Sequence, residues 1–365
     1  MNPQMLRRQI VNAFQKSLYA RRIAGKPVLS QLIEMLRLRL SEGEIAPDEY
    51  YNYELYNDHL FSFSAKRDFV GGRAAAKLYA RLNSLRWGAI ARDKILFYTL
   101  MRGLGVRIPK LYAVYCPARR VFNGVPCITE PSAMTEFLQN GMSYPFFAKP
   151  IRGAHGVGAI AVNCFNHRSQ TLLIRTGEQI RVHDFVTNLL HKNKIGYLFQ
   201  ERLAPHPAVR EICGASLSTI RMVVFLSDGG PRLLHAIWRI PRGSNMTDSF
   251  AGGTTGNLIG QIDIKTGRVV EVVQGVGPYR SLTEVHPDSG KPVTGVILPN
   301  WEDSVKLCLR TATSLPDLRL QCWDVAMCPD GPLLIEVNDH GNLNIVQYAR
   351  RAGFRNTEFR RCLDW

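Results

Sequence analysis

The sequence predicts an α+β fold in which a mainly helical N-terminal region precedes a body of strands and helices. Up to about residue 88 the apolar residues follow helical spacing, whereas from Asp93 onward short strand-like runs alternate with helical stretches. Turn sequences at Lys265-Thr266-Gly267 and Pro329-Asp330-Gly331 each separate two strand-like runs, so we expect two antiparallel hairpins. Hairpins favour an α+β fold over a purely parallel, doubly wound sheet.

The N-terminal region is expected to contain an amphipathic helix. Its apolar stripe consists of Leu29, Leu32, Ile33, Leu36 and Leu40. Arg37 and Arg39 are assigned to the other side of this helix. Because an apolar stripe is normally buried, we expect this helix to pack against the rest of the protein, which makes the N-terminal region part of the folded body.

A second helix is predicted to begin at Pro47, because proline fits the first turn and the following Asp48 and Glu49 suit its positive end. Four tyrosines follow, and we interpret them as packing residues: Tyr50, Tyr51, Tyr53 and Tyr56. Residues 62–72 are polar and contain glycine, so we expect a loop there.

The later elements are predicted in chain order. A helix near residues 93–101 is expected to end at Gly103 and Gly105, since glycine suits helix C-termini. Strand-like runs occupy residues 111–115, 145–151, 158–162, 197–203, 219–227 and 233–240.

Composition narrows the class of protein. The 365 residues are 45% hydrophobic and 21% charged, as in ordinary globular proteins, and the apolar runs are too short to span a bilayer. The eight cysteines form no C-x-x-C pair and have no histidine cluster nearby, so we do not expect a zinc site. Scattered cysteines suit a reducing compartment, and we therefore expect a cytoplasmic protein.

The net charge of +16 fits an anionic partner such as a nucleotide, an acidic or phosphorylated sugar, a nucleic acid or a membrane surface. A solvated basic surface would give the same charge. Lysine and arginine are spread from Arg7 to Arg361 without a recognisable nucleic-acid motif, so we expect no nucleic-acid partner. Residues 1–26 contain no acid and no apolar signal core, which argues against a secretory signal and leaves an arginine-rich transit peptide as the alternative.

The first motif with chemistry is a lysine followed by a glycine-rich loop. Lys149 ends the run Phe146-Phe147-Ala148-Lys149-Pro150, and Arg152-Gly153-Ala154-His155-Gly156-Val157-Gly158 follows. Glycines let backbone N–H groups approach phosphate oxygens, and Lys149 can supply a point charge to the same phosphates. The lysine precedes the glycines, so this is neither a Walker A loop nor a Rossmann fingerprint. A tight hairpin loop would use the same residues.

The C-terminal hairpin is predicted to gather oxygen ligands. A three-residue loop at 329–331 pairs Cys328 with Pro332 and thereby places Asp324 opposite Glu336, with Asn338 on the same face. Facing carboxylates repel unless a cation lies between them, and two carboxylates with an amide oxygen suit Mg²⁺ bound with ATP phosphates.

The opposite face of this hairpin is expected to consist of Val325, Met327, Ile335 and Val337. A two-residue Asp330-Gly331 loop would break that apolar face, so we disfavour it. A polar face that is simply solvated is the remaining alternative to a metal site.

The strand-like run 197–203 leads into Ala204-Pro205, and backbone groups at such a strand exit can read an adenine edge. An ordinary strand followed by a loop has the same pattern.

Together and in this order, these segments resemble the ATP-grasp superfamily, and most closely its sugar-transfer-associated family. The resemblance covers about residues 29–348. It also includes Asp93-Lys94, Ser218-Thr219-Ile220-Arg221 and Gly252-Gly253. It implies an ATP-grasp fold, in which two α/β lobes clasp ATP. We place a helical N-terminal region at 1–88, a small α/β segment at 89–143, a lobe with the glycine-rich loop and adenine hinge at 144–205, and a lobe with the metal site and acceptor loop at 206–365.

The resemblance also implies roles for individual residues. The residues expected to bind ATP are Lys94, Lys149, Arg152, Gly153, His155, Gly156, Gly158, Gln200, Glu201 and Leu203. Arg221 and Lys149 are expected to be catalytic, at the γ-phosphate or acyl phosphate. Asp324, Glu336 and Asn338 are expected to hold Mg²⁺. Relatives place a ribose-binding acid just past the hinge, where this chain has Ala204-Pro205-His206-Pro207, so Glu211 is the nearest substitute.

The function implied by the resemblance is that of an ATP- and Mg²⁺-dependent ligase. A substrate carboxylate is activated as an acyl phosphate and joined to an amine, with an anionic small molecule or sugar conjugate as acceptor. Residues 239–257 are expected to form a mobile lid over the acceptor site. An ATP-grasp phosphotransferase acting on a hydroxyl or carboxylate and an accessory protein with a degenerate ATP site remain the alternatives. The family name indicates polysaccharide or sugar-conjugate biosynthesis.

Overall fold

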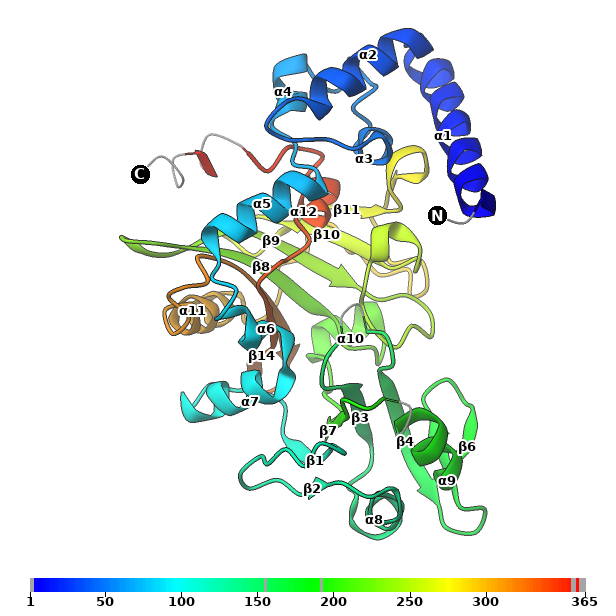
Figure 1. Ribbon diagram of the computed structural model, residues 1–365, viewed down its shortest axis with the longest axis vertical. Helices are drawn as coiled ribbons and strands as arrows, with labels where there is room; N and C mark the ends of the chain where they lie inside the picture. The colour runs from blue at the N-terminus through cyan, green and yellow to red at the C-terminus, as the bar shows by residue number, and fades with distance from the viewer. Residues whose placement is uncertain (1–2, 154–155, 191–192, 356–358, 361–365) are drawn as a thin grey trace.

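The protein is described here by a computed structural model that covers residues 3–153, 156–190, 193–355 and 359–360, with the backbone alone for 3–13 and 189. Along its long axis, N-terminal helices lie at one end, the sheet formed by strands of residues 219–338 lies in the middle, and the sheet formed by strands of residues 111–201 lies at the other end (Figure 1). This arrangement of helices and mostly antiparallel strands confirms the predicted α+β class.

Helices fill the chain up to the first strand. In the described part they are α1 Pro3–Ala24, α2 Val28–Arg39, α3 Pro47–Asn52, α4 Phe63–Arg67, α5 Gly72–Leu82, α6 Gly88–Arg92 and α7 Lys94–Gly103. Asp93 caps α7, because its side chain accepts hydrogen bonds from the N–H groups of Ile95 and Leu96. The capped start fixes Lys94 in the first turn of α7.

The first sheet has the strand order β2-β1-β7-β3-β4-β5-β6. Its strands are β1 Leu111–Tyr115, β2 Cys127–Ile128, β3 Phe146–Pro150, β4 Ile160–Asn166, β5 Thr171–Ile174, β6 Gln179–Arg181 and β7 Tyr197–Glu201. The accompanying helices are α8 Pro131–Glu136, η1 Phe137–Gly141, α9 Val182–Asp184 and η2 Phe185–Leu190. Side chains alternate along β3, so Phe146 and Ala148 enter the core while Phe147 and Lys149 face a cavity.

The second sheet has the order β12-β11-β10-β9-β8-β13-β14. Its strands are β8 Thr219–Ser227, β9 Gly230–Ile240, β10 Leu258–Ile262, β11 Val269–Gln274, β12 Ser281–Leu282, β13 Leu320–Cys328 and β14 Gly331–Asn338. The other elements are α10 Pro207–Cys213, η3 Ala251–Gly253, η4 Gly277–Tyr279, α11 Trp301–Ala312 and α12 Leu343–Arg350.

Both faces of the second sheet are buried. Met222 and Val224 of β8 join the core that contains α11, whereas Val223 and Phe225 join the core that contains α12 and the N-terminal helices. Burial on both faces explains why β8 is a continuous apolar run and not an alternating one.

The N-terminal helices are attached to this second core. All four tyrosines that were predicted to be packing residues are buried there: Tyr50, Tyr51, Tyr53 and Tyr56. Asn83, just after α5, exchanges hydrogen bonds with the backbone of Leu320, with Nδ2 2.8 Å from the carbonyl oxygen and Oδ1 2.9 Å from the nitrogen. The predicted loop at 62–72 instead contains α4, because Ser62 caps a helix start by accepting from Ala65 N–H.

The apolar stripe of α2 is exposed, contrary to the expectation from its sequence. Its exposed fractions are Leu29 69%, Leu32 54%, Ile33 47%, Leu36 60% and Leu40 79%. The buried face of α2 is instead formed by Gln31, Glu34 and Leu38. Glu34 accepts hydrogen bonds from Lys26 Nζ at 2.6 Å and Lys66 Nζ at 2.8 Å, and this buried ion-paired cluster turns the polar side of α2 inward.

The C-terminal hairpin has a different turn from the one predicted but the predicted pairing of its acids. Cys328 pairs with Gly331, so the loop has two residues, Pro329 and Asp330. A bulge between Asp324 and Val325 then restores the register, and Asp324 lies opposite Glu336.

The same bulge moves one residue off the predicted apolar face. Val325 pairs with Leu334, and Leu334 takes the core position that was predicted for Ile335. Ile335 lies among the residues that line the cavity.

Candidate functional site

A cavity of about 890 Å³ lies between the two sheets. Strands β3 and β7 of the first sheet and strands β8, β9, β13 and β14 of the second contribute to its walls, together with the glycine-rich loop and the segment 246–252. The predicted site residues in the lining are Lys94, Lys149, Arg152, Gly153, Gly156, Gln200, Glu201, Leu203, Arg221, Asp324, Glu336 and Asn338. The volume falls in the range of small-molecule sites.

The cationic end of the cavity is formed by Lys149 and Lys94. Lys149 is 7% exposed, and its Nζ lies 5.3 Å from the ring centroid of Tyr98. Lys94 comes from the first turn of α7, and its Nζ donates to the carbonyl oxygen of Gly153 at 3.1 Å. Among the described residues, neither lysine has a carboxylate within 4.0 Å.

Burial, reinforced by the charge of Lys94, lowers the pKa of Lys149 to about 7. Burial also lowers the pKa of Lys94, against the attraction of Glu336. The charge of Lys94 opposes protonation of Lys149, so an anion beside the two amines would stabilise the charged form of both. A polyphosphate fits this site.

The glycine-rich loop borders this end of the cavity. Gly153, Gly156 and Gly158 adopt φ values of 138°, 72° and 76°, which favour glycine. A Cβ on Gly156 would lie 2.7 Å from Thr247 Cγ2, so the loop touches the segment from the other lobe. Gly158 packs against Pro150 and is absent from the cavity lining. His155 lies outside the described residues.

Arg152 is positioned by an ion pair and not by the loop alone. Its Nε lies 3.1 Å from Asp93 Oδ2, which also pairs with Arg120 Nη1 at 2.6 Å. Asp93 therefore links the start of α7, which carries Lys94, to the start of the glycine-rich loop.

The predicted adenine hinge lies at the end of β7. The side chain of Gln200 is buried and accepts from Tyr98 Oη at 2.7 Å, while Glu201 Oε1 accepts from the backbone N–H of Lys110 at 2.7 Å. Both side chains are thus committed to protein contacts, which leaves backbone groups at the strand exit for ligand recognition. Glu211 is exposed on α10 and is not among the lining residues.

Apolar walls flank this hinge. The cavity lining includes Phe147, Ala161, Leu203, Leu217 and Ile335, which come from both sheets and the adjoining loop. A flat heteroaromatic ring suits such a slot, because its faces are apolar while its edge can bond to the backbone.

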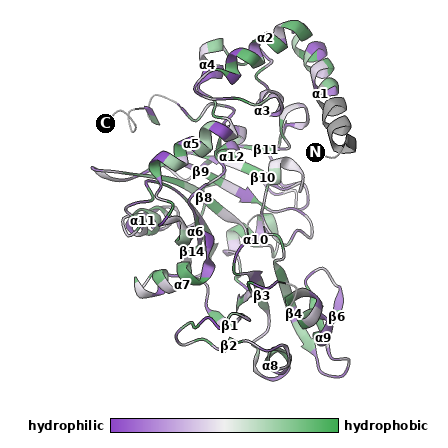
Figure 2. Ribbon diagram, in the orientation of Figure 1, coloured by the Kyte–Doolittle hydropathy of each residue, from purple (hydrophilic) through white to green (hydrophobic). Residues whose placement is uncertain are grey.

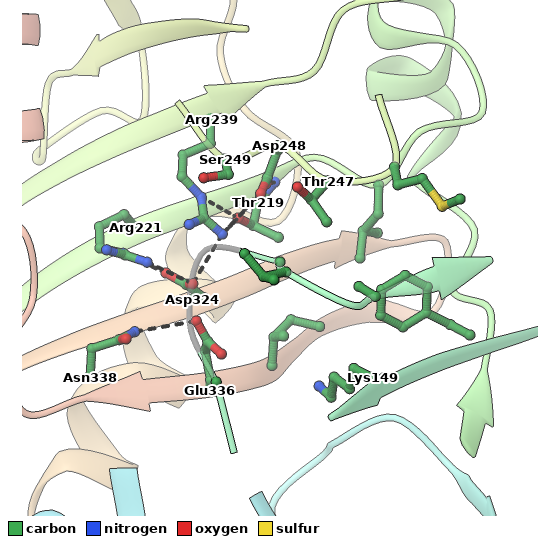
Figure 3. A pocket seen from close by; sticks show the side chains of 18 of the residues that line it. Lys149, Thr219, Arg221, Arg239, Thr247, Asp248, Ser249, Asp324, Glu336 and Asn338 are labelled. Carbon is green, nitrogen blue, oxygen red and sulfur yellow. Dashed lines mark hydrogen bonds and ion pairs between the residues drawn. The ribbon is translucent and has the colours of Figure 1, made fainter. Parts of the chain in front are cut away.

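The acidic face holds Asp324, Glu336 and Asn338 on neighbouring strands (Figure 3). Burial and the nearby charge of Asp324 raise the pKa of Glu336. Asn338 Nδ2 donates to Glu336 Oε1 at 3.5 Å. A cation beside Glu336 would compensate the buried negative charge of this carboxylate. The oxygen donors of Glu336 and Asn338 therefore fit Mg²⁺.

Asp324 differs from the other two residues because its charge is already compensated. Arg221 donates to both of its oxygens, from Nε at 2.6 Å and Nη2 at 2.8 Å, and Arg239 Nη2 lies 3.0 Å from Oδ2. Burial raises the pKa of Asp324, but these two arginines outweigh burial and hold the pKa well below its ordinary value. Arg221, which was expected to be catalytic, is likewise held in this ion pair within the sheet.

Sequence reasoning missed a second polar group around Arg239. Its guanidinium also pairs with Asp248 Oδ1 at 3.0 Å and donates to Thr219 Oγ1 at 2.8 Å (Figure 3). Asp248 in turn accepts from Thr219 N at 2.8 Å. Arg239 lies at the edge of a run that had been interpreted as a strand followed by a lid, and only the sheet pairing brings it to Asp324.

The segment 241–257 is tied together by one buried amide. Asn257 is 0% exposed; its Oδ1 accepts from Arg242 N at 2.9 Å and from Asn245 Nδ2 at 2.7 Å, and its Nδ2 donates to Ser249 O at 2.8 Å. These bonds give the segment a defined shape, with Thr247 against the glycine-rich loop. That the segment moves as a lid over the acceptor site stays a prediction.

A third group missed from the sequence lies at another edge of the cavity. Arg92 Nη2 lies 2.7 Å from Asp339 Oδ2, and His340 Nδ1 lies 3.1 Å from the same oxygen. Asp339 and His340 directly follow Asn338 in the sequence. This position next to a predicted site residue could have indicated that they line the cavity.

Comparison with known proteins gives one family. The model of the sugar-transfer associated ATP-grasp family matches residues 73–361. A comparison of the sequence with curated proteins gives no match.

Among solved structures, the chain is similar to an L-amino acid ligase from Bacillus licheniformis, at 12% identity and a TM-score of 0.41, over 80% of this chain and 52% of that one. It is also similar to a D-alanine-D-alanine ligase from Helicobacter pylori, at 10% identity and a TM-score of 0.44, over 80% of this chain and 67% of that one. The chain thus spans about half the length of the first of these ligases.

Proposed function

The chain belongs to the sugar-transfer-associated ATP-grasp family and has the ATP-grasp fold, and from this premise we propose that it is an ATP-dependent ligase that activates a carboxylate and joins it to an amine. The observation that carries the proposal is the meeting of Lys149, Lys94 and Glu336 in one cavity between the two sheets. These three side chains come from separate elements, and their charges act on one another there.

ATP would lie across the cavity. The slot between Phe147, Leu203 and Ile335 would take the adenine, with backbone groups at the end of β7 reading its edge. Lys94 and Lys149 would bind the phosphates, beside the glycine-rich loop. This placement uses the anion-fitting end and the apolar end of the same cavity.

Glu336 and Asn338 would hold Mg²⁺, which when bound would neutralise charge on the phosphate oxygens. Asp324 could still offer a lone pair, because a carboxylate has about four acceptor positions. Its stronger role would be to hold Arg221 and Arg239 in place, since both arginines bond to it.

The chemistry follows from these positions. A carboxylate oxygen of the substrate attacks the γ-phosphorus, the bond to the bridging oxygen breaks, and ADP leaves. An amine nitrogen then attacks the acyl carbon, and phosphate leaves with the proton of the amine. Lys149 and Arg221 would stabilise the negative charge that develops in both steps, so catalysis would be mainly positioning and electrostatics.

An anionic acceptor fits the remaining walls. Arg175 and Arg202 line the cavity and have no carboxylate within 4.0 Å among the described residues, whereas the lining residues Arg92 and Arg239 are already ion-paired. Arg175 Nη1 donates to Asn245 O at 3.3 Å, which places this cation at the wall made by the 241–257 segment. The word sugar-transfer in the family description supports an acceptor from sugar-conjugate or polysaccharide assembly.

The test measures ATP consumption with paired acids and amines. Calorimetry first checks for ATP binding with and without Mg²⁺; absence of binding in both conditions would exclude the proposal. Candidate carboxylates are then supplied with and without amines, and ADP and phosphate are quantified. We expect both products only when acid and amine are present together.

Isotope transfer separates the ligase from a phosphotransferase. With an ¹⁸O-labelled carboxylate, a ligase transfers label to inorganic phosphate, because the acyl phosphate loses its carboxylate oxygen when the amine attacks. ADP release with a stable phosphorylated acceptor and no inorganic phosphate would instead assign a phosphotransferase. The variant Lys149→Met serves as the control that ADP arises at this site.

A further inference from the structure

The helix α2 presents apolar side chains to solvent on one continuous face. At about 100° per residue, its five exposed aliphatic residues from Leu29 to Leu40 lie within an arc of roughly 100°. That arc is opposite Leu38, which is 0% exposed. Isolated apolar residues on a surface are ordinary, whereas a contiguous stripe marks an interaction site.

Two arginines border this stripe. Arg37 and Arg39 lie about 80° from the centre of the stripe, one on each side. They therefore flank the stripe and do not lie on the opposite side of the helix, to which we had assigned them. Arg37 is exposed, while Arg39 Nη1 donates to the carbonyl oxygen of Glu44 at 2.9 Å. Arginine stems can lie along an apolar surface while their charged ends reach polar groups beyond it.

The end of α1 has the same pattern. Phe14 and Leu18 are 61% and 44% exposed, and Arg21 lies on the same face one turn further along. Ser17 and Ala20 form the buried side of this part of the helix. The two helices together thus expose apolar and cationic residues at the end of the molecule opposite the first sheet (Figure 2).

Basic residues outnumber acidic residues at this surface. Residues 1–41 contain one acid, Glu34, which is 8% exposed and paired with Lys26 and Lys66. The basic residues of the same stretch are Arg7, Arg8, Lys16, Arg21, Arg22, Lys26, Arg37 and Arg39. The exposed acids nearby are Asp58, which pairs with the same two lysines, and Glu42 just beyond the end of α2, so basic groups outnumber acidic groups around the two helices.

We propose that α1 and α2 form a peripheral docking surface for an anionic lipid bilayer, with the α2 stripe inserted at the headgroup boundary and the flanking arginines bound to lipid phosphates. This combination of an apolar stripe, flanking arginines and an excess of basic over acidic residues is the pattern of interfacial helices. None of the helices in the described residues is long and apolar enough to cross a membrane, so the attachment is to its surface.

A second copy of this chain fits the surface less well. Pairing two such faces would bring Arg21, Arg37 and their neighbours against the same cations, and like charges repel. A bilayer supplies negative charge and an apolar layer together. Docking at this end does not cover the cavity between the two sheets, since none of the lining residues in the described part of the chain belongs to α1 or α2.

The experiment measures co-sedimentation of the full chain with vesicles of phosphatidylcholine alone and with vesicles enriched in phosphatidylglycerol. We expect binding to the second kind, weakened by added salt. The double variant Leu32→Gln, Leu36→Gln should lower the partition coefficient at least about tenfold, because two inserted side chains are lost. The double variant Arg21→Gln, Arg37→Gln should lower it roughly tenfold and reduce the salt dependence.

The matched control is Leu85→Gln, Val121→Gln, which replaces side chains that are 71% and 84% exposed outside α1 and α2. This variant should bind vesicles like the unmodified chain. Circular dichroism checks that every variant is folded, and if the leucine variant unfolds, the arginine variant and the salt titration decide.

Two results would overturn the inference. One is equal or absent binding to the two kinds of vesicle. The other is a dimer in light scattering that the leucine variant disperses, which would assign the surface to a second copy of the chain.

Discussion

Replacement of Lys149 by methionine examines the phosphate end of the cavity. The change keeps the length of the side chain but removes a charge held where the proposed phosphoryl group transfers. Loss of one such group should lower the ADP-release rate at saturating Mg-ATP by roughly 10²–10³. The matched control is Lys306→Met on α11, where the side chain is 73% exposed, and its rate should equal that of the unmodified protein.

The same substitution should stabilise the fold at neutral and lower pH. Burial lowers the pKa of Lys149 from 10.5 to about 7, so its charged form costs the folded protein on the order of 5 kcal/mol, at about 1.4 kcal/mol per tenfold change in proton affinity. Between these two pH values the unfolded chain binds the proton and the folded chain does not. The stability of the unmodified protein therefore rises with pH through this window.

Lys149→Met lacks the amine, so the contribution of this amine to the rise of stability with pH should be absent in the variant. Urea unfolding near pH 6, 8 and 10 measures the effect as the difference in free energy of unfolding between the two proteins, largest at the lowest pH and close to zero at the highest. A difference that does not change with pH would contradict the assignment of a buried, weakly basic lysine.

Nucleotide binding should raise the pKa of Lys149, which burial lowers in the free protein. An anion beside the amine raises its pKa, so ATP binding near pH 8 should take up a proton, which calorimetry in buffers of different ionisation enthalpy detects. Lys149→Met should show less uptake. The reasoning is refuted if this variant turns over ATP at nearly the original rate, or if it binds ATP with unchanged proton uptake.

Three further predictions concern the acidic strands and the N-terminal helices. Glu336→Gln should reduce Mg²⁺-dependent ADP release by about 10² or more while the melting temperature is unchanged or higher, because the substitution removes a buried charge beside Asp324; a large fall in melting temperature would argue against it. Asp324→Asn should lower the free energy of unfolding by about 3–5 kcal/mol in urea titrations, because Arg221 loses its buried counter-charge. The control variant Asp330→Asn, in the exposed turn, should change the free energy of unfolding by less than about 0.5 kcal/mol. A chain that begins at Asp93 should melt well below the full chain or fail to fold, because it lacks the buried tyrosines of residues 50–79, and equal stability and activity would show the N-terminal helices to be dispensable.

Local sequence patterns predicted most of the elements that build the site. The strand at residues 111–115 was placed at its observed bounds, and the helix expected near residues 93–101 corresponds to α7, Lys94–Gly103. These predictions succeed because strand alternation and helix caps depend on neighbours within a few residues. The glycine spacing after Lys149 was informative for the same reason, since positive φ values are a local property.

The register of the C-terminal hairpin shows where local rules reach their limit. The facing pair Asp324 and Glu336 was predicted, but through a turn of the wrong length, and the bulge at Ile335 compensated for the error. A bulge is set by how the strand packs on both sides, so its position is not visible in the turn sequence alone.

The sequence by itself determined the α+β class and the position of most of the longer strands, and it pointed to part of the set of residues that line the cavity. Only the tertiary structure decided which charges meet. Arg239 reaches Asp324 because β8, which pairs with β9, also pairs with β13, and these strands are far apart in the sequence. In the same way, Lys26 and Lys66 converge on Glu34 and turn the apolar stripe of α2 outward, against its own periodicity. The physical reason is that periodicity identifies two faces of an element, whereas the energies of distant ion pairs and buried contacts select which face is buried.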